Sequence, residues 1–150
     1  MGLSARSTAQ ARLSPFQLEG LNGPLSWSAG PGGQSWLYLD FWASWCGPCR
    51  LSFPWMNRIH DQWQGRGLRI VAVTVDRRRE DALTFLKSNP ARFEIAFDAQ
   101  GGLARQLDIK TMPTSLLVAP DGRIVHRHEG FTASLGDQAA QLIQSTLSSS

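Results

Sequence analysis

Apolar residues in the first half of this chain follow two different periods. Residues 36–42 form a nearly continuous apolar run, and residues 68–75 form a second run that is rich in β-branched side chains. Both are typical of strands buried on both faces of a mainly parallel sheet, and the first should be the central strand. Between them, apolar positions of residues 48–64 recur at helical spacing and predict a helix. These positions are Leu51, Trp55, Met56, Ile59 and Trp63.

The rest of the chain predicts further alternation of strands and helices. Hairpins are expected where Asn22-Gly23 and Asp121-Gly122 separate short strand-like runs. The 150 residues have the size of one domain, and no internal repeat or linker divides them. The expected elements are hairpin strands at 16–18 and 25–27, a helix at 80–88, a strand at 93–97, a short helix at 101–107, hairpin strands at 115–119 and 123–128, and a helix at 135–147.

The first residues differ in composition from the rest. Residues 1–14 contain almost nothing apolar, so they cannot bury enough surface to offset the entropy of ordering. We expect a flexible tail at 1–14 and one domain at 15–150. The tail lacks the apolar region of a signal peptide, although residues 9–11 have the small-x-small pattern that precedes signal cleavage. A trimmed export segment and a tail of accidental composition both fit. No window reaches the roughly 18 uninterrupted apolar residues of a membrane span.

Charge and cysteine content exclude several classes of protein. With 15 basic and 12 acidic residues the net charge is +3, too small an excess for a nucleic-acid-binding protein. Two cysteines are too few for a disulfide scaffold or for a four-cysteine zinc site. His126 and His128 alternate on a predicted strand and therefore share a face. We interpret them as surface histidines of an edge strand rather than as metal ligands that meet the cysteines.

Both cysteines lie in one motif, Cys46-Gly47-Pro48-Cys49, where the central strand leads into the first helix. At a helix N-terminus the partial positive charge and the free N–H groups favour a thiolate, which makes Cys46 the expected attacking thiol. Cys49 follows one helical turn later, so its sulfur can close a disulfide with Cys46 or resolve a mixed disulfide. The motif predicts a redox-active pair rather than half of a metal site or two inert thiols.

Two further positions are candidates for the same site. Asp40 lies in the middle of the central apolar strand, where an unpartnered charge is costly, so its pKa should be raised. Six residues before Cys46, it is a candidate general base that deprotonates Cys49; a structural carboxylate at a strand end is the alternative. Pro113 stands just before an apolar strand, where a cis Met112-Pro113 bond fits.

Taken together, these residues resemble the thioredoxin superfamily. The similarity is carried by Asp-Phe-Trp-Ala-Ser-Trp-Cys-Gly-Pro-Cys-Arg at 40–50, by Pro54, and by Met-Pro-Thr at 112–114. Within the superfamily the chain is most similar to the TlpA/ResA-like bacterial thioredoxins, and the likeness extends over residues 15–147. The additional patterns are F-x-L-x-x-L-x-G at 16–23, F-D-x-x-G-x-L-A at 97–104, I-x-x-x-P-T-S at 109–115 and D-G-R-I-V at 121–125.

The resemblance implies an α/β thioredoxin fold, with a central mixed β-sheet flanked by helices, an N-terminal β-hairpin and a helix-strand insertion near 77–97. It implies a cis Pro113 packed beside Cys46 that presents backbone to the substrate. It also implies a thiol:disulfide oxidoreductase, active in electron transfer as a monomer without cofactor or metal. The partners would be protein disulfides and a protein that restores the dithiol. Residues implied at the substrate surface are Trp45, Gly47, Pro48, Met112, Pro113 and Thr114.

Location and mechanism each leave an alternative open. Many relatives are anchored or exported and act in the periplasm, but this chain shows no anchor, so a cytoplasmic location is the alternative. Many TlpA/ResA-like members have Asn in place of Asp40, and the lysine of thioredoxins is missing because 68–75 offers only Arg69. The other functions considered are a thiol peroxidase, whose Pro-x-x-x-Thr/Ser-x-x-Cys context is absent before Cys46, and a thioredoxin-like metal-binding or docking module.

Overall fold

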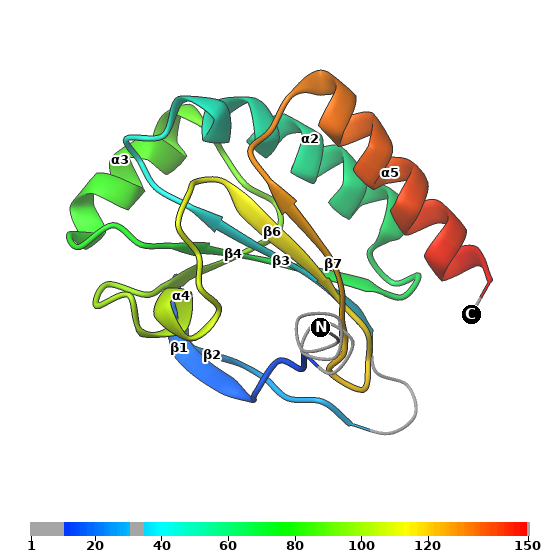
Figure 1. Cartoon of the computed structure of the whole chain (residues 1–150). Helices are drawn as coiled ribbons and strands as arrows, with labels where there is room; N and C mark the ends of the chain where they lie inside the picture. Colours follow the sequence, from blue (N-terminus) through cyan, green and yellow to red (C-terminus); the bar gives the residue numbers. More distant parts are fainter. Residues whose placement is uncertain (1–10, 31–34, 150) are drawn as a thin grey trace, which may run out of the picture.

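In the part of the chain that the structure describes, residues 11–30 and 35–149, seven strands form one mixed sheet (Figure 1). The structure is a computed structural model. The strand order across the sheet is β2-β1-β5-β4-β3-β6-β7. The strands are β1 (Phe16–Gly20), β2 (Gly23–Trp27), β3 (Trp36–Trp42), β4 (Leu68–Thr74), β5 (Glu94–Phe97), β6 (Thr114–Val118) and β7 (Ile124–Glu129).

Helices cover both faces of this sheet and create two apolar cores. Figure 1 shows α2, α3 and α5 together on one face, with α4 on the other face near the β1–β2 hairpin. Trp42, Phe53 and Phe85 lie in the first core, and Phe41, Val73 and Leu103 lie in the second. None of the helices in the described residues is both long and apolar enough to cross a membrane. The helices are α2 (Gly47–Trp63), α3 (Arg79–Ser88), α4 (Gly102–Gln106) and α5 (Ala133–Ser148).

The expected elements are all present, with ends displaced by at most two residues. The helix-strand insertion corresponds to α3 and β5. The expectation of a mainly parallel sheet is wrong, however, because only β3–β4 and β4–β5 pair in parallel, whereas the other four pairings are antiparallel. Two of these four follow from the tight hairpins that join β1 to β2 and β6 to β7, because a tight hairpin can only join antiparallel strands. The other two, β1–β5 and β3–β6, join strands that are distant in the sequence. The mixed sheet is confirmed.

Residues 11–14, the part of the expected tail that the structure describes, pack against the domain. Leu13 is buried, its N–H donates to the carbonyl of Gly122 at 2.8 Å, and Arg12 forms a β-bridge with Arg123. Residues 11–14 therefore do not behave as the expected flexible tail, because a single apolar side chain and backbone hydrogen bonds hold them to β7. Residues 1–10 lie outside the described residues.

Three segments from distant parts of the chain meet at one end of the central strands. Because β3 and β4 run in parallel and β6 runs opposite to β3, the ends of β3 and β4 lie beside the beginning of β6. Residues 43–46 follow β3, residues 75–76 follow β4, and residues 111–113 precede β6. The strand directions thus bring the cysteine motif, Asp76 and the loop with Pro113 to the same end of the sheet.

Candidate active site

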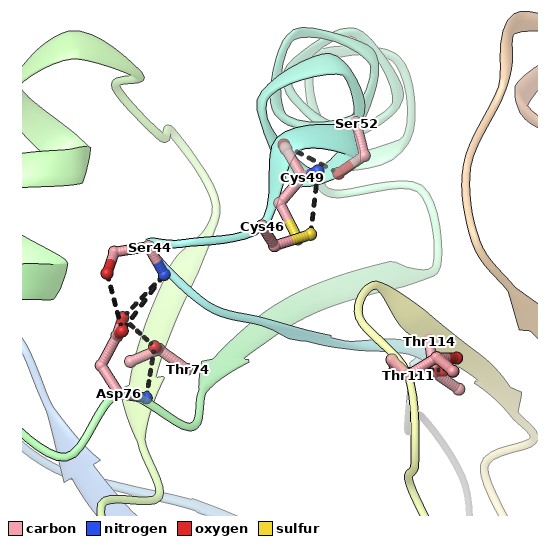
Figure 2. Close-up of a disulfide and its surroundings, with 8 residues drawn as sticks. All are labelled: Ser44, Cys46, Cys49, Ser52, Thr74, Asp76, Thr111 and Thr114. Atoms are coloured by element: carbon pink, nitrogen blue, oxygen red, sulfur yellow. Dashed lines mark hydrogen bonds between the residues drawn. A yellow bond between two sulfur atoms is a disulfide. The ribbon is translucent and has the colours of Figure 1, made fainter.

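Cys46 and Cys49 are joined by a disulfide at the start of α2 (Figure 2). Cys46 is the N-cap of the helix, and its Sγ accepts a hydrogen bond from the backbone N–H of Cys49 at 3.2 Å. Both residues are buried, with exposed fractions of 4% and 0%. Cys46 and Cys49 therefore differ little in exposure. Cys46 differs from Cys49 in its place at the positive end of α2 and in the N–H that can stabilise its thiolate.

The loop before Cys46 is fixed by a buried carboxylate. Asp76 accepts hydrogen bonds from the Ser44 N–H at 3.0 and 3.2 Å and from the Ser44 hydroxyl at 2.7 Å (Figure 2). The hydroxyl of Thr74 donates to the same carboxylate at 2.6 Å. Because Thr74 and Asp76 come from the end of β4, this network ties the loop that presents Cys46 to the neighbouring strand. The sequence analysis did not identify Asp76; the signal for it was its position directly after a predicted buried strand.

The residues around the disulfide form an exposed rim. Trp45 is 71% exposed, and Gly47 and Pro48 are exposed as well. A Cβ added at Gly47 meets no atom within 4 Å, so the first position between the cysteines faces open space. Pro48 occupies the first turn, where its missing N–H leaves no helical hydrogen bond unmade. The rim thus places a large aromatic surface beside the buried disulfide and leaves open space over Gly47.

The loop that precedes β6 contains the expected cis bond, between Met112 and Pro113. Its shape is held by Thr114, whose hydroxyl donates to the carbonyl of Thr111 at 2.7 Å, and by Gly130, whose N–H donates to the carbonyl of Pro113 at 2.8 Å. Met112 packs against the apolar core that also contains Cys46. Pro113 and Thr114 are buried, whereas Met112 is partly accessible and Thr111 is exposed.

Asp40 is a buried carboxyl group with an unsatisfied atom. Only 3% of the residue is exposed, and its Oδ2 has no hydrogen-bond partner among the described residues. Burial raises the pKa of this carboxyl well above its ordinary value, as the sequence predicts. Its register partner on β4 is Ala72, while Arg69 pairs with Glu94 at 2.7 Å elsewhere. Arg69, the basic residue that 68–75 offers in the absence of the lysine of thioredoxins, therefore gives Asp40 no charge partner.

A small cavity of about 10 Å³ lies beside Asp40. This volume is close to the smallest that accommodates one water molecule. Tyr38 and Ser115 share a hydrogen bond of 2.8 Å on its wall, and Ser52 adds a third hydroxyl. The Ser52 hydroxyl donates to the carbonyl of Cys49 at 3.1 Å, which links the cavity to the second cysteine of the motif. The sequence analysis missed these hydroxyls because each lies inside an apolar strand or helix pattern and only the folded chain brings them together.

The two histidines of β7 lie side by side at the edge of the sheet, with ring centroids 4.1 Å apart. His126 is exposed, but His128 is half-buried and lines the cavity beside Asp40. The expected shared face is confirmed, whereas the interpretation of both as surface residues holds only for His126. In the described residues, no three His, Cys, Asp or Glu side chains are grouped closely enough to hold a metal ion.

Comparison with known proteins relates this chain to thiol-disulfide oxidoreductases. The model of the AhpC/TSA family matches residues 10–127. Thiol-disulfide oxidoreductase ResA of Bacillus subtilis is 33% identical over 113 residues, which are 73% of this chain and 61% of that protein. ResA of Bacillus cereus is 29% identical over 94 residues, or 63% of this chain and 54% of that protein. The chain thus spans little more than half the length of the curated relatives it matches.

Solved structures confirm the expected thioredoxin-like fold. A Chlorobium tepidum protein provisionally named thiol:disulfide interchange protein DsbE is 40% identical, with a TM-score of 0.85 over 91% of this chain and 95% of that one. A thiol-disulfide oxidoreductase of Bacteroides fragilis is 26% identical, with a TM-score of 0.74 over 88% of this chain and 99% of that one. StoA of Bacillus subtilis is also 26% identical, with a TM-score of 0.70 over 85% and 95%.

The buried carboxyl leads to a prediction about stability. Replacement Asp40→Asn should raise the free energy of unfolding of the oxidised protein, by an amount that grows with pH. In the unfolded chain the carboxyl ionises near pH 3.9, whereas in the folded protein its raised pKa retains the proton, so the wild type loses stability as the pH rises from about 4 through that pKa. Urea unfolding of both proteins between about pH 4 and pH 9 measures this difference. An advantage of the variant that is equal at every pH would contradict the raised pKa.

Proposed function

We propose that this chain, which belongs to the AhpC/TSA family of the thioredoxin superfamily, is a thiol:disulfide oxidoreductase that reduces disulfides in exported proteins. The observation that supports this most directly is the Cys46–Cys49 disulfide at the first turn of α2, where the Cys46 sulfur accepts the N–H of Cys49. A helix N-terminus stabilises a thiolate, and the second sulfur is already within bonding distance of the first.

The proposed reaction is a dithiol-disulfide exchange in two steps. The Cys46 thiolate attacks one sulfur of the substrate disulfide, forms a mixed disulfide with it and releases the other sulfur as a thiolate. Cys49 then loses its proton and attacks the Cys46 sulfur, which closes the Cys46–Cys49 disulfide and releases the second substrate sulfur. Two electrons pass to the substrate, and a separate redox partner returns two electrons to the pair.

Asp40 is proposed to accept the proton of Cys49 in the second step. A carboxyl with a raised pKa is a stronger base than an ordinary carboxylate, and burial keeps Asp40 away from bulk solvent. Its position supports this role because the cavity beside it is also bordered by Ser52, which bonds to the carbonyl of Cys49. Asp76, in contrast, is engaged by three donors and holds the Cys46 loop.

The substrate is proposed to bind across the rim of the disulfide. Trp45 offers apolar surface, and Gly47 and Pro48 leave the Cys46 sulfur approachable from one side. On the opposite side, backbone of Met112 and Pro113 would pair with an extended substrate segment, with Thr114 holding that loop in shape. A protein disulfide in an extended segment fits this arrangement better than a small molecule, because the rim is open rather than enclosed.

Two other functions are less well supported. A thiol peroxidase of the Pro-x-x-x-Thr/Ser-x-x-Cys type needs Pro seven residues and Thr or Ser three residues before its cysteine, but Leu39 and Ala43 stand there. A metal-binding module would need a further ligand beside the two cysteines, and the described residues offer no group of three ligands. A docking module would have no use for a redox-active cysteine pair. Titration of the reduced protein with copper or zinc during an insulin-reduction assay separates these functions. Tight metal binding without insulin reduction would favour the module.

We propose that the protein works in the periplasm as a monomer. This rests on the resemblance to TlpA/ResA-like proteins, whose members are commonly exported or anchored, and not on any segment of this chain. Fractionation of cells that express the full-length gene product would test the location, and sedimentation of the purified protein would test the monomer.

The first prediction of this proposal concerns the order of attack. Cys49→Ser should trap a mixed disulfide between Cys46 and a protein substrate, because the attacking thiol remains and the resolving thiol is gone. Cys46→Ser should trap none. Non-reducing electrophoresis of both variants after incubation with an oxidised substrate detects the trapped species. Trapping through Cys49 alone would reverse the assignment.

The second prediction concerns Asp40. Reaction of the reduced protein with Ellman's reagent releases one chromophore when Cys46 attacks and a second when Cys49 resolves the mixed disulfide. In Asp40→Asn the second release should be slower by about a hundredfold near neutral pH, because the proton acceptor is lost while the shape is kept. The first release should not change. Asp137→Asn, the same substitution at an exposed position of α5, is the matched control. A normal second release between about pH 6 and pH 8 would make Asp40 a structural carboxylate.

The third prediction concerns the direction of electron flow. The reduction potential should be nearer to the roughly −270 mV of thioredoxin than to the roughly −120 mV of the oxidant DsbA. Strong oxidants owe their potential to an extremely stabilised thiolate, but no histidine lies between these cysteines, and the Arg50 guanidinium lies over the Phe85 ring. Free thiols counted after equilibration in glutathione buffers give the potential. A value above about −180 mV would indicate an isomerase or an oxidant.

A further inference from the structure

A row of polar side chains crosses three adjacent strands from the buried carboxyl to the edge of the sheet. In the register of the sheet, Asp40 on β3 is paired with Ser115 on β6, and Ser115 is paired with His128 on β7. Directly paired residues project from the same face of a sheet, so these three side chains lie in line on one face. The row begins in the interior and ends at β7, the edge strand.

The cavity beside Asp40 connects this row. Asp40, Ser115 and His128 all line the same small cavity, whose volume approaches that of one water molecule. The next row on the same face ends at His126, which is exposed and lies beside His128 with ring centroids 4.1 Å apart and the rings tilted by 54°. Polar side chains thus follow one another from the unpartnered Asp40 carboxyl, past the cavity, to the exposed His126.

We infer that His128 is the proton outlet of Asp40: it passes the proton that Asp40 receives from Cys49 to His126 and to solvent. This inference rests on the proposed role of Asp40. The Asp40 carboxyl releases its proton to water or the Ser115 hydroxyl in the cavity, one nitrogen of His128 accepts it, and the other nitrogen releases its own proton outward. No electrons move in this step, and Asp40 returns to its ionised form ready for the next turnover.

The charged surroundings of His128 suit this role. The titratable groups that face it are Asp40 and Tyr38 from β3 and His126 from its own strand, whereas the cavity walls from α2 and α5 are uncharged. Burial and the nearby His126 lower the pKa of His128 to about 4, so the ring is neutral at neutral pH and does not hold the proton. It relays the proton instead, because one nitrogen accepts as the other releases. The uncharged wall residues are Ser52, Trp55, Met56, Leu135 and Ala139.

The test is the second chromophore release, measured at several concentrations of buffer. In His128→Asn it should be slower by about tenfold in dilute buffer and should recover as buffer is added, because small buffer molecules then carry the proton. In His128→Ala, imidazole should restore the rate more than an equally basic but bulkier buffer, because the vacated space admits it. His60→Asn, a change of a histidine on α2 outside the cavity, should behave as the wild type.

A double variant separates this inference from the role of Asp40. If both groups act on one proton, Asp40→Asn combined with His128→Asn should be no slower than Asp40→Asn alone. A normal rate for His128→Asn at every buffer concentration, while Asp40→Asn is slow, overturns the outlet and leaves the role of Asp40 intact. A normal rate for Asp40→Asn overturns the proposed base itself. Slowing by His128→Asn that neither buffer nor imidazole relieves shows a structural effect and also overturns the outlet.

Discussion

Strand β3 hydrogen-bonds to β4 along one side and to β6 along the other, and the position of the site follows from this double pairing. The parallel partner β4 brings Thr74 and Asp76 to the end of β3, where the chain leaves the sheet toward Cys46. The antiparallel partner β6 brings the cis-proline loop to the same place. Helix α2 then begins directly after its N-cap Cys46 and is held by aromatic packing of Phe53 against Trp42. The cysteine pair is therefore positioned by backbone pairing and packing that lie behind it.

The same strand also contains two unfavourably buried polar atoms. Oδ2 of Asp40 and Nε1 of Trp42 are both buried without a hydrogen-bond partner, two residues apart on one face of β3. Buried polar atoms without partners are unfavourable by about 1–3 kcal/mol each, more for a charged group. A core selected for stability alone would place apolar atoms at position 40. The carboxyl is consistent with a group kept for proton transfer, in a cavity too small to flood with solvent.

Local patterns predicted much of this molecule, since hydrophobic period and turn residues are properties of short segments. They predicted the helix at Cys46, the central strand with Asp40, and the hairpins that form the two edges of the sheet. They did not predict the contact between Ser44 and Asp76, nor the row from Asp40 through Ser115 to His128, because these depend on strand register between distant segments. The expectation of a flexible tail at residues 11–14 failed for a similar reason, because composition does not show that a single side chain, Leu13, is buried against the domain.

The contact of the first described residues with β7 has a consequence for solubility. Strand β7 is an edge of the sheet, and an uncovered edge offers unpaired N–H and C=O groups to other molecules. Ile124 donates its N–H to the carbonyl of Ala11, and the bridge between Arg12 and Arg123 occupies the beginning of the strand. The short segment thus occupies backbone groups at the beginning of this edge, and the charged cluster of Arg12, Arg123 and Asp121 lies where a second sheet would have to approach.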